Sequence, residues 1–122
     1  MAKILIIEDN LEIRENSTEI LELEGHIIIT AENGRLGVDM AFNNLPDIIL
    51  CDIMMPELNG YEVLTALKKN ENTLKIPLIF ISASTESKDI KIGLDMGAVA
   101  YLRKPFEIEE LVNVIRRCLS GV

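Results

Sequence analysis

The stretch Pro46–Gly60 constrains the fold of this chain more than any other part of the sequence. It contains the apolar run Ile48–Cys51, which is rich in β-branched residues and too short for a helix. Such a run is typical of a strand buried on both faces, as in a parallel sheet. The run ends on the carboxylate of Asp52, and Pro56 then breaks the chain. Because ligands bind at the carboxyl ends of strands in open α/β sheets, Asp52 stands where chemistry is expected.

Two other apolar runs end on oxygen-bearing side chains in the same way. Residues 4–7 are followed by Glu8 and Asp9, and residues 78–81 are followed by Ser82. The carboxyl ends of parallel strands meet at one edge of a sheet, so these side chains are expected to join the aspartate above in one site.

The whole chain alternates strand and helix patterns five times. Strands are predicted at residues 4–7, 27–29, 48–51, 78–81 and 98–102. The first helix is predicted over 11–24 with Gly25 as its C-cap, the second begins at Asn33-Gly34, and the third begins at Asn59 with Glu62 as its capping partner. The fourth is predicted around 90–97 and the fifth over 108–119. The fifth helix has an apolar face of Ile108, Leu111, Val112, Ile115 and Leu119. This alternation predicts the α/β class, with a doubly wound parallel sheet covered by helices on both faces.

Composition and charge restrict the classes of function. The 122 residues fit a single domain over 1–122, and 48% hydrophobic with 26% charged residues indicates a globular protein. The net charge of −8 argues against direct nucleic-acid binding, which normally needs a basic face. The sequence shows neither a membrane-spanning stretch nor a signal peptide, so a cytoplasmic protein without membrane contact is expected. Cys51 and Cys118 are then expected to be free thiols.

Several catalytic motifs are missing from the sequence. The glycine-rich signatures of dinucleotide and P-loop binding do not occur. His26 is the only histidine, and it stands at the start of the second predicted strand, away from the strand ends that carry the oxygen side chains. This placement argues against a Ser-His-Asp triad and against a histidine metal site.

The carboxylates at the strand ends need a compensating charge. Two carboxylates about 4 Å apart repel by ~4 kcal/mol at an effective dielectric constant near 20. A raised pKa or a bound hard cation relieves this repulsion, and Mg²⁺ suits a site of few carboxylates, several waters and a phosphate oxygen. Lys104 adds a positive charge and Ser82 a hydroxyl, both of which suit phosphoryl oxygens. A carboxylate in these surroundings is equipped to form an aspartyl phosphate.

The chain resembles the receiver (CheY-like) domain of bacterial two-component response regulators over essentially its whole length. Four pieces in order carry the resemblance: Glu8-Asp9, Asp52-Ile53-Met54-Met55-Pro56 with Gly60, Ser82-Ala83, and Lys104-Pro105-Phe106. The resemblance implies a flavodoxin-like (βα)5 fold with five strands in the order 2-1-3-4-5.

The resemblance also implies a function and a role for each site residue. Asp52 would accept a phosphoryl group from a histidine kinase or a histidine phosphotransfer protein, and phosphorylation would switch binding to a downstream protein. Such a domain is a phosphoacceptor in a phosphorelay rather than an enzyme, although it assists its own phosphorylation and slow autodephosphorylation. The resemblance implies that Asp9, Asp52 and the backbone carbonyl of Met54 bind Mg²⁺, and that Glu8 contacts the ion through water. It implies that Lys104 and Ser82 contact the phosphoryl oxygens and that Ser82 acts with Tyr101 as a switch. It also implies a cis peptide bond before Pro105.

Simpler interpretations stand beside these roles. Asp9 or Asn10 is also suited to capping the first helix, and Tyr101 is equally well explained by core packing. The glutamates of the first helix are most simply a solvated face: Glu12, Glu15, Glu19, Glu22 and Glu24.

Three other classes of function are alternatives for this sequence. A haloacid-dehalogenase-like phosphatase needs a second acid two residues after its aspartate, where this chain has Met54. A flavodoxin-like flavin carrier needs a hydroxyl-rich phosphate loop and stacking aromatics, but aromatic residues make up only 4%. An interaction module that works without phosphorylation stays open. The sequence leaves the kinase, the output, the oligomeric state and any further domain undetermined, although Val99-Ala100 lacks the paired acids of one dimerising branch of the family.

Overall fold

Five strands form one parallel sheet in the computed structural model, which describes residues 1–83 and 86–120. The strands are β1 (Lys3–Ile7), β2 (Ile27–Ala31), β3 (Ile48–Asp52), β4 (Leu78–Ser82) and β5 (Ala100–Arg103). Their order in the sheet is β2-β1-β3-β4-β5, which confirms the predicted topology. β1 and β3, the strands that end on acidic residues, are therefore direct neighbours.

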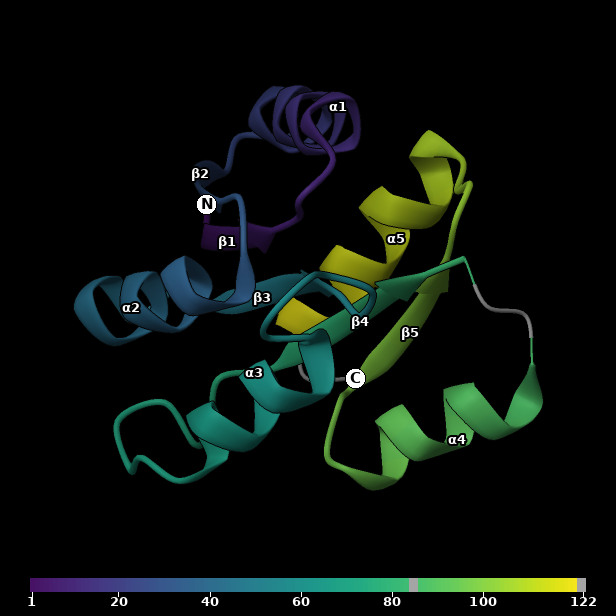
Figure 1. The fold of residues 1–122 in the computed structure, drawn as a ribbon. Helices are drawn as coiled ribbons and strands as arrows, with labels where there is room; N and C mark the ends of the chain where they lie inside the picture. The colour runs from purple at the N-terminus through teal and green to yellow at the C-terminus, as the bar shows by residue number, and fades with distance from the viewer. Residues whose placement is uncertain (84–85, 121–122) are drawn as a thin grey trace.

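Helices connect the strands and cover both faces of the sheet (Figure 1). They are α1 (Leu11–Leu23), α2 (Gly34–Asn44), α3 (Gly60–Lys68), α4 (Ser87–Asp95) and α5 (Ile108–Leu119). α1 and α5 lie on one face, and α2, α3 and α4 lie on the other. This confirms the doubly wound α/β arrangement.

Alternate strand residues divide between two apolar cores, one on each face of the sheet. In β1, Leu5 and Ile7 pack under α2 and α3, whereas Ile4 and Ile6 pack under α1 and α5. All four side chains are fully buried. Side chains alternate between the faces of a strand, so a strand covered by helices on both sides reads as an unbroken apolar run.

Asparagine caps fix the start of three helices. Asn10 Oδ1 accepts a hydrogen bond from the Ile13 N–H at 2.9 Å, and Asn33 caps α2 in the same manner. The predicted pair of Asn59 and Glu62 forms a reciprocal capping box at the start of α3. A Cβ atom on Gly60 would lie 2.6 Å from the Asp52 carbonyl oxygen, so glycine lets α3 begin directly against the end of β3.

The structure corrects several predicted boundaries. β2 extends to Ala31, two residues beyond its apolar run. β5 begins at Ala100 rather than at Ala98, because the Ala98 N–H donates to the Gly93 carbonyl and thereby closes the end of α4. Ile108 is 58% exposed and does not join the apolar face of α5, because it is the first residue of the helix.

Candidate functional site

The pairing of β1 with β3 brings the acidic residues together. Ile7 lies beside Cys51 in the register of the two strands, so the next residue of each strand is a carboxylate. The carboxylates of Glu8, Asp9 and Asp52 each offer an oxygen within 4.8 Å of the others. Glu8 and Asp52 are buried, whereas Asp9 is exposed. The site is thus an acidic cluster that opens to solvent on one side.

Lys104 closes the buried side of the acidic cluster. Its Nζ atom lies 2.8 Å from Glu8 Oε1 and 3.3 Å from Asp52 Oδ2. The Lys104 N–H donates to the Ser82 carbonyl at 2.9 Å, which ties the segment after β5 to the end of β4. The peptide bond between Lys104 and Pro105 is cis. One ammonium group therefore bridges the ends of β1 and β3.

Glu8 is held by hydrogen bonds on both sides of its peptide unit. Its N–H donates to the Ala31 carbonyl at 3.0 Å, and its own carbonyl accepts from Arg14 Nη1 at 2.8 Å. Its Oε2 accepts from the Asn10 N–H at 3.2 Å. The loop between β1 and α1 is thereby fixed around the first carboxylate of the site.

Burial and like charge perturb Asp52. Desolvation first, and then the charge of Glu8, raise its pKa from 3.8 to about 7, although the charge of Lys104 acts in the opposite direction. Burial opposes the charge of Lys104, but the close approach of Glu8 and the charge of Asp52 outweigh it and raise the lysine pKa. Asp52 Oδ1 also accepts a hydrogen bond from the Met54 N–H at 3.3 Å. The metal-free cluster thus favours an additional positive charge.

The donor set fits a hard divalent cation. Glu8 Oε1 is buried, and within the described residues the Lys104 ammonium at 2.8 Å is what compensates its charge. Asp9 presents an exposed carboxylate on the open side. Mg²⁺ takes oxygen ligands and keeps several waters, which a partly open cluster of three carboxylates allows. The residues present therefore fit the predicted magnesium ion.

Ser82 and Tyr101 lie on the paired strands β4 and β5, where Tyr101 is in register with Phe80, two residues before Ser82. Ser82 ends β4 and is 2% exposed, and it pairs in register with Arg103. Tyr101 is half-buried and packs against the core on the face covered by α2, α3 and α4. Its hydroxyl is buried without a hydrogen-bond partner in the described part of the chain. Core packing of Tyr101 is thus observed, and its role as a switch stays a prediction.

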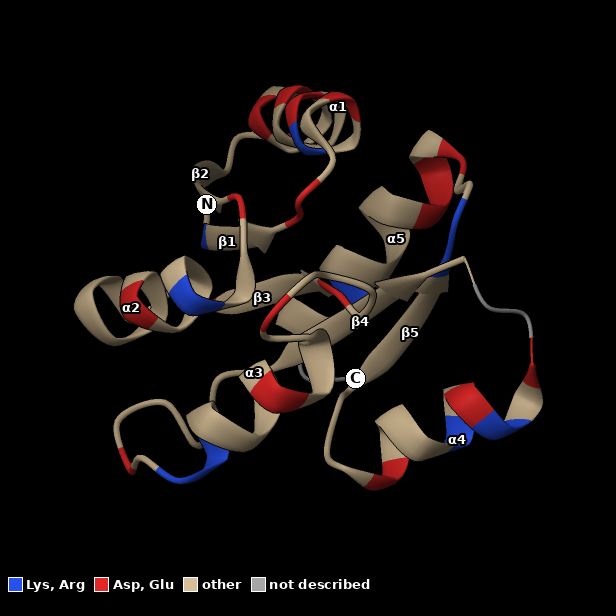
Figure 2. Cartoon of the chain, viewed as in Figure 1, with Lys and Arg blue, Asp and Glu red and all other residues tan. Residues whose placement is uncertain are grey.

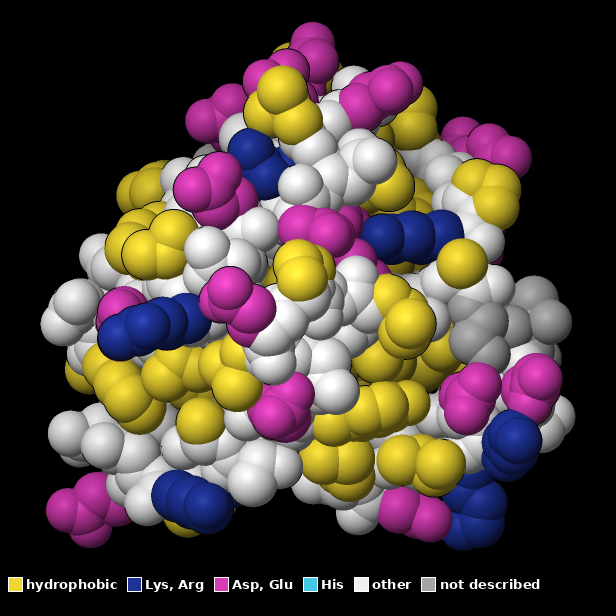
Figure 3. Space-filling model, in the orientation of Figure 1, with side chains coloured by type: hydrophobic (Ala, Val, Ile, Leu, Met, Phe, Trp, Pro, Cys, Tyr) yellow, Lys and Arg dark blue, Asp and Glu magenta, His cyan; other side chains and the backbone are white. Residues whose placement is uncertain are grey.

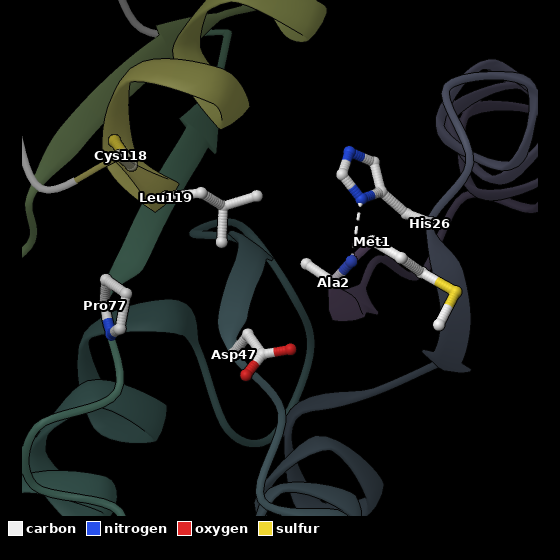
Figure 4. Close-up of a pocket in the computed structure, with 7 residues that line it drawn as sticks. All are labelled: Met1, Ala2, His26, Asp47, Pro77, Cys118 and Leu119. Carbon is white, nitrogen blue, oxygen red and sulfur yellow. Dashed lines mark hydrogen bonds between the residues drawn. The ribbon is translucent and has the colours of Figure 1, made fainter.

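The histidine and the cysteines lie outside this site. His26 Nδ1 accepts the Ala2 N–H at 3.2 Å at the opposite edge of the sheet, as Figure 4 shows. The cavity there has a volume of about 450 Å³ and is lined by Met1, Ala2, His26, Asp47, Pro77, Cys118 and Leu119. Cys51 and Cys118 are free thiols, as predicted. A histidine-based triad at the strand ends is therefore excluded for the described residues.

Charge is distributed unevenly over the surface. The predicted solvated face of α1 is present, since its glutamates are exposed and acidic residues recur along the helix (Figure 2). In the space-filling view, acidic and basic side chains meet near the middle of the face shown, with hydrophobic side chains around them (Figure 3). Within the described residues, no helix is long and apolar enough to cross a membrane.

The fold and the acidic edge together define a class of signalling domain, and comparison with known proteins gives the family. The model of the response regulator receiver domain matches residues 4–116. The chain belongs to this family, whose members act in two-component signalling as phosphoacceptors. Family membership favours that role over the phosphatase and the flavin carrier considered above.

Individual relatives share the sequence and the fold. The chain is 39% identical to protein PilH of Pseudomonas aeruginosa, with 99% of this chain and 100% of PilH covered. It is 38% identical to the probable transcriptional regulator ycf29 of Pyropia yezoensis, covering 97% of this chain but 53% of that protein. The chain spans about half the length of most of the curated relatives compared.

A solved structure with the same fold contains a metal. The receiver domain of the sensor histidine kinase PA1611 from Pseudomonas aeruginosa superimposes with a TM-score of 0.90 at 28% identity, covering 98% of each chain. That structure has a magnesium ion coordinated in its active-site cleft. Receiver domains bind Mg²⁺ at an acidic site, and this chain has an acidic cluster at the carboxyl ends of β1 and β3.

Arg14 was missed by the sequence analysis. Its guanidinium reaches the Glu8 carbonyl from the first turn of α1. It is the only basic residue between Leu11 and Glu24, in a helix that otherwise carries acids. That isolation was visible in the sequence and could have marked the residue.

Proposed function

We propose that residues 1–122 form one receiver domain in which Asp52 accepts a phosphoryl group from a phosphohistidine of a kinase or phosphotransfer protein. The observation that carries the proposal is the position of Asp52, a buried carboxylate between two other acids and the Lys104 ammonium. In the transfer, the N–P bond of the phosphohistidine breaks as an O–P bond to Asp52 forms. The N–P electron pair stays on the ring nitrogen, and the imidazole of the partner leaves neutral because its other ring nitrogen carries a proton. The chain is thus a phosphoacceptor and not a general catalyst.

The proposed ligand set combines the acidic cluster with a backbone carbonyl that the resemblance to receiver domains implies. Asp9, Asp52 and the Met54 carbonyl would hold Mg²⁺ directly, and Glu8 would contact it through water because Lys104 occupies its Oε1 side. When bound, Mg²⁺ neutralises charge on the incoming phosphoryl group. Placing the ion at this cluster also relieves the repulsion among the carboxylates.

Other residues of the chain would receive the phosphoryl oxygens. The Lys104 ammonium already lies 3.3 Å from Asp52 Oδ2, where it is suited to hold one oxygen of the phosphorylated side chain. Ser82, at the end of the adjacent strand, would bind another through its hydroxyl. Movement of Ser82 toward the phosphoryl group would let Tyr101 shift and alter the surface that a downstream protein recognises.

A surface beside the site suits a protein partner. A cavity of about 710 Å³ lies between α1 and the start of α5, and Lys104 forms part of its wall. The side chains lining it are mostly apolar, and Leu23 and Ile108 are 82% and 58% exposed. Apolar side chains in a cavity whose wall includes Lys104 suit docking of the phosphohistidine donor. We propose that the donor binds here and that the downstream target is another protein rather than nucleic acid.

Phosphorylation by a small donor tests the assignment of Asp52. Wild-type protein, Asp52→Asn and the exposed control Asp39→Asn are incubated with acetyl phosphate, with Mg²⁺ or with EDTA, and analysed by intact mass spectrometry. Wild type and Asp39→Asn should gain one phosphoryl group only with Mg²⁺, and Asp52→Asn should gain none. Phosphate on Asp52→Asn, or equal labelling in EDTA, contradicts the proposal.

A further inference from the structure

We infer that Arg14 is a positioning residue of the acidic cluster, which holds Asp9 in place for the cation by fixing the peptide unit that precedes it. This inference deepens the proposed function and rests on it. The Arg14 Nη1 atom donates to the Glu8 carbonyl at 2.8 Å, and this carbonyl belongs to the peptide bond that joins Glu8 to Asp9. The orientation of that peptide plane determines where the Asp9 side chain begins.

Asp9 needs such a support because nothing else holds its side chain. Its carboxylate is exposed and makes no hydrogen bond or ion pair within the described residues. Its neighbours are anchored, since the Glu8 N–H and the Asn10 N–H both donate within the protein. Asp9 is therefore the one carboxylate of the cluster that depends on the backbone alone.

Arg14 is built into the fold in a way that suits this task. It is half-buried on α1, where its N–H donates to the Asn10 carbonyl at 3.0 Å, so its own backbone is fixed by the first turn of the helix. Its side chain lies beside a cavity of about 270 Å³ between α1 and the start of α2, next to Ala31. Ala31 in turn accepts the Glu8 N–H. Arg14 thus joins the loop after β1 to α1, and the hydrogen bond from the Glu8 N–H to Ala31 joins the same loop to β2.

The sign of the effect distinguishes positioning from simple electrostatics. Arg14 is a cation, and removing a cation near three carboxylates strengthens their attraction for Mg²⁺. A through-space role therefore predicts tighter Mg²⁺ binding when the charge is removed. A positioning role predicts weaker Mg²⁺ binding, because the loss of a group that orients a metal ligand lowers the metal affinity about tenfold.

The test compares Arg14→Met and Arg14→Lys with Arg35→Met, a control that removes the same charge from an exposed position on α2. Calorimetric titration with Mg²⁺ should give a dissociation constant about tenfold higher than wild type for Arg14→Met. Arg14→Lys keeps the charge and a donor and should recover most of the loss. Arg35→Met should bind as tightly as wild type or slightly more tightly. If Arg14→Met does not fold, Arg14→Gln replaces it in the same titration.

Hydrogen exchange of the metal-free protein provides a second readout. The Asn10 amide, which donates to Glu8 Oε2, should exchange faster in Arg14→Met, whereas core amides of α1 such as Leu21 should keep their protection. Unchanged or tighter Mg²⁺ binding by Arg14→Met overturns the inference while leaving the proposed function intact. If wild type itself binds no Mg²⁺, the proposed function fails and the inference fails with it.

Discussion

Replacing Asp52 with asparagine should stabilise the metal-free protein although it removes the reactive group. The substitution keeps the shape and the oxygen that accepts the Met54 N–H, but it removes a charge that burial and Glu8 disfavour. Raising the pKa of Asp52 from 3.8 to about 7 lowers the free energy of unfolding by at most ~4 kcal/mol, at about 1.4 kcal/mol per pKa unit. The cluster is open to solvent on the side of Asp9, and Lys104 partly compensates the charge. We therefore expect Asp52→Asn to raise the free energy of unfolding by about 1–2 kcal/mol.

The pH dependence provides the more specific test. A carboxyl group whose pKa is raised by folding binds more protons in the folded state, so stability falls as pH rises between the two pKa values. The penalty from Asp52 is thus absent below pH 3.8 and complete above about pH 7. Asp52→Asn should melt only slightly higher than wild type at pH 5 and roughly 3–8 °C higher at pH 8.

Thermal unfolding followed by circular dichroism in EDTA measures this difference. Asp39→Asn, which removes an exposed carboxylate on α2, controls for the overall change of net charge. Equal melting temperatures for wild type and Asp52→Asn at pH 8 would refute the reasoning. A difference as large at pH 5 as at pH 8 would also refute it, because the gain would then not come from the buried charge.

Three further expectations concern the cation, the lifetime of the phosphorylated state and the partner. Mg²⁺ at ten times its dissociation constant should stabilise wild type by about 1.4 kcal/mol, and Asp52→Asn by clearly less at the same concentration, as melting curves with and without the ion will show. Met54 is 72% exposed beside Asp52 and its thioether positions water poorly, so phosphorylated protein should be long-lived. Met54→Asn combined with Ser84→Glu, a position outside the described residues, should speed loss of phosphate in a radiolabel assay without weakening Mg²⁺ binding; an equally slow double variant contradicts this. Ile108→Glu should slow transfer from a phosphohistidine donor but not from acetyl phosphate, and equal slowing with both would exclude this surface as the docking site.

The buried strands and the strand-end acids could be predicted because each leaves a local pattern. Ile48–Cys51 is apolar without interruption since helices cover both of its faces, and such a run ends visibly when Asp52 follows. Placing Glu8 beside it required one further rule, the adjacency of the first and third strands. The capping pair could also be predicted from the sequence, since the side chains of Asn59 and Glu62 each accept a hydrogen bond from the other's backbone N–H at a fixed spacing of three residues.

What the sequence did not provide depends on contacts between distant or weakly patterned residues. β2 extends to Ala31 because pairing with β1 continues past the apolar run, and a polar Thr30 hides this continuation. The start of β5 depends on whether the Ala98 N–H closes α4 or joins the sheet, which local propensity does not decide. Arg14 was missed for a similar reason, because its bond to Glu8 returns across a loop and belongs to no standard motif.

The repulsion between carboxylates in the site and the site's expected function have the same physical origin. Because burial and Glu8 raise the pKa of Asp52 to about 7, a proton would compete with the proposed Mg²⁺ for this carboxylate at neutral pH, and binding of the ion would release that proton. The single positive charge of Lys104 does not neutralise the two buried carboxylates, which lie 2.8 and 3.3 Å from its ammonium. A phosphoryl group on Asp52 would draw this ammonium from Glu8 toward new oxygens. Through this shared lysine, phosphorylation of Asp52 would alter a contact at the end of β1 and the segment that follows β5.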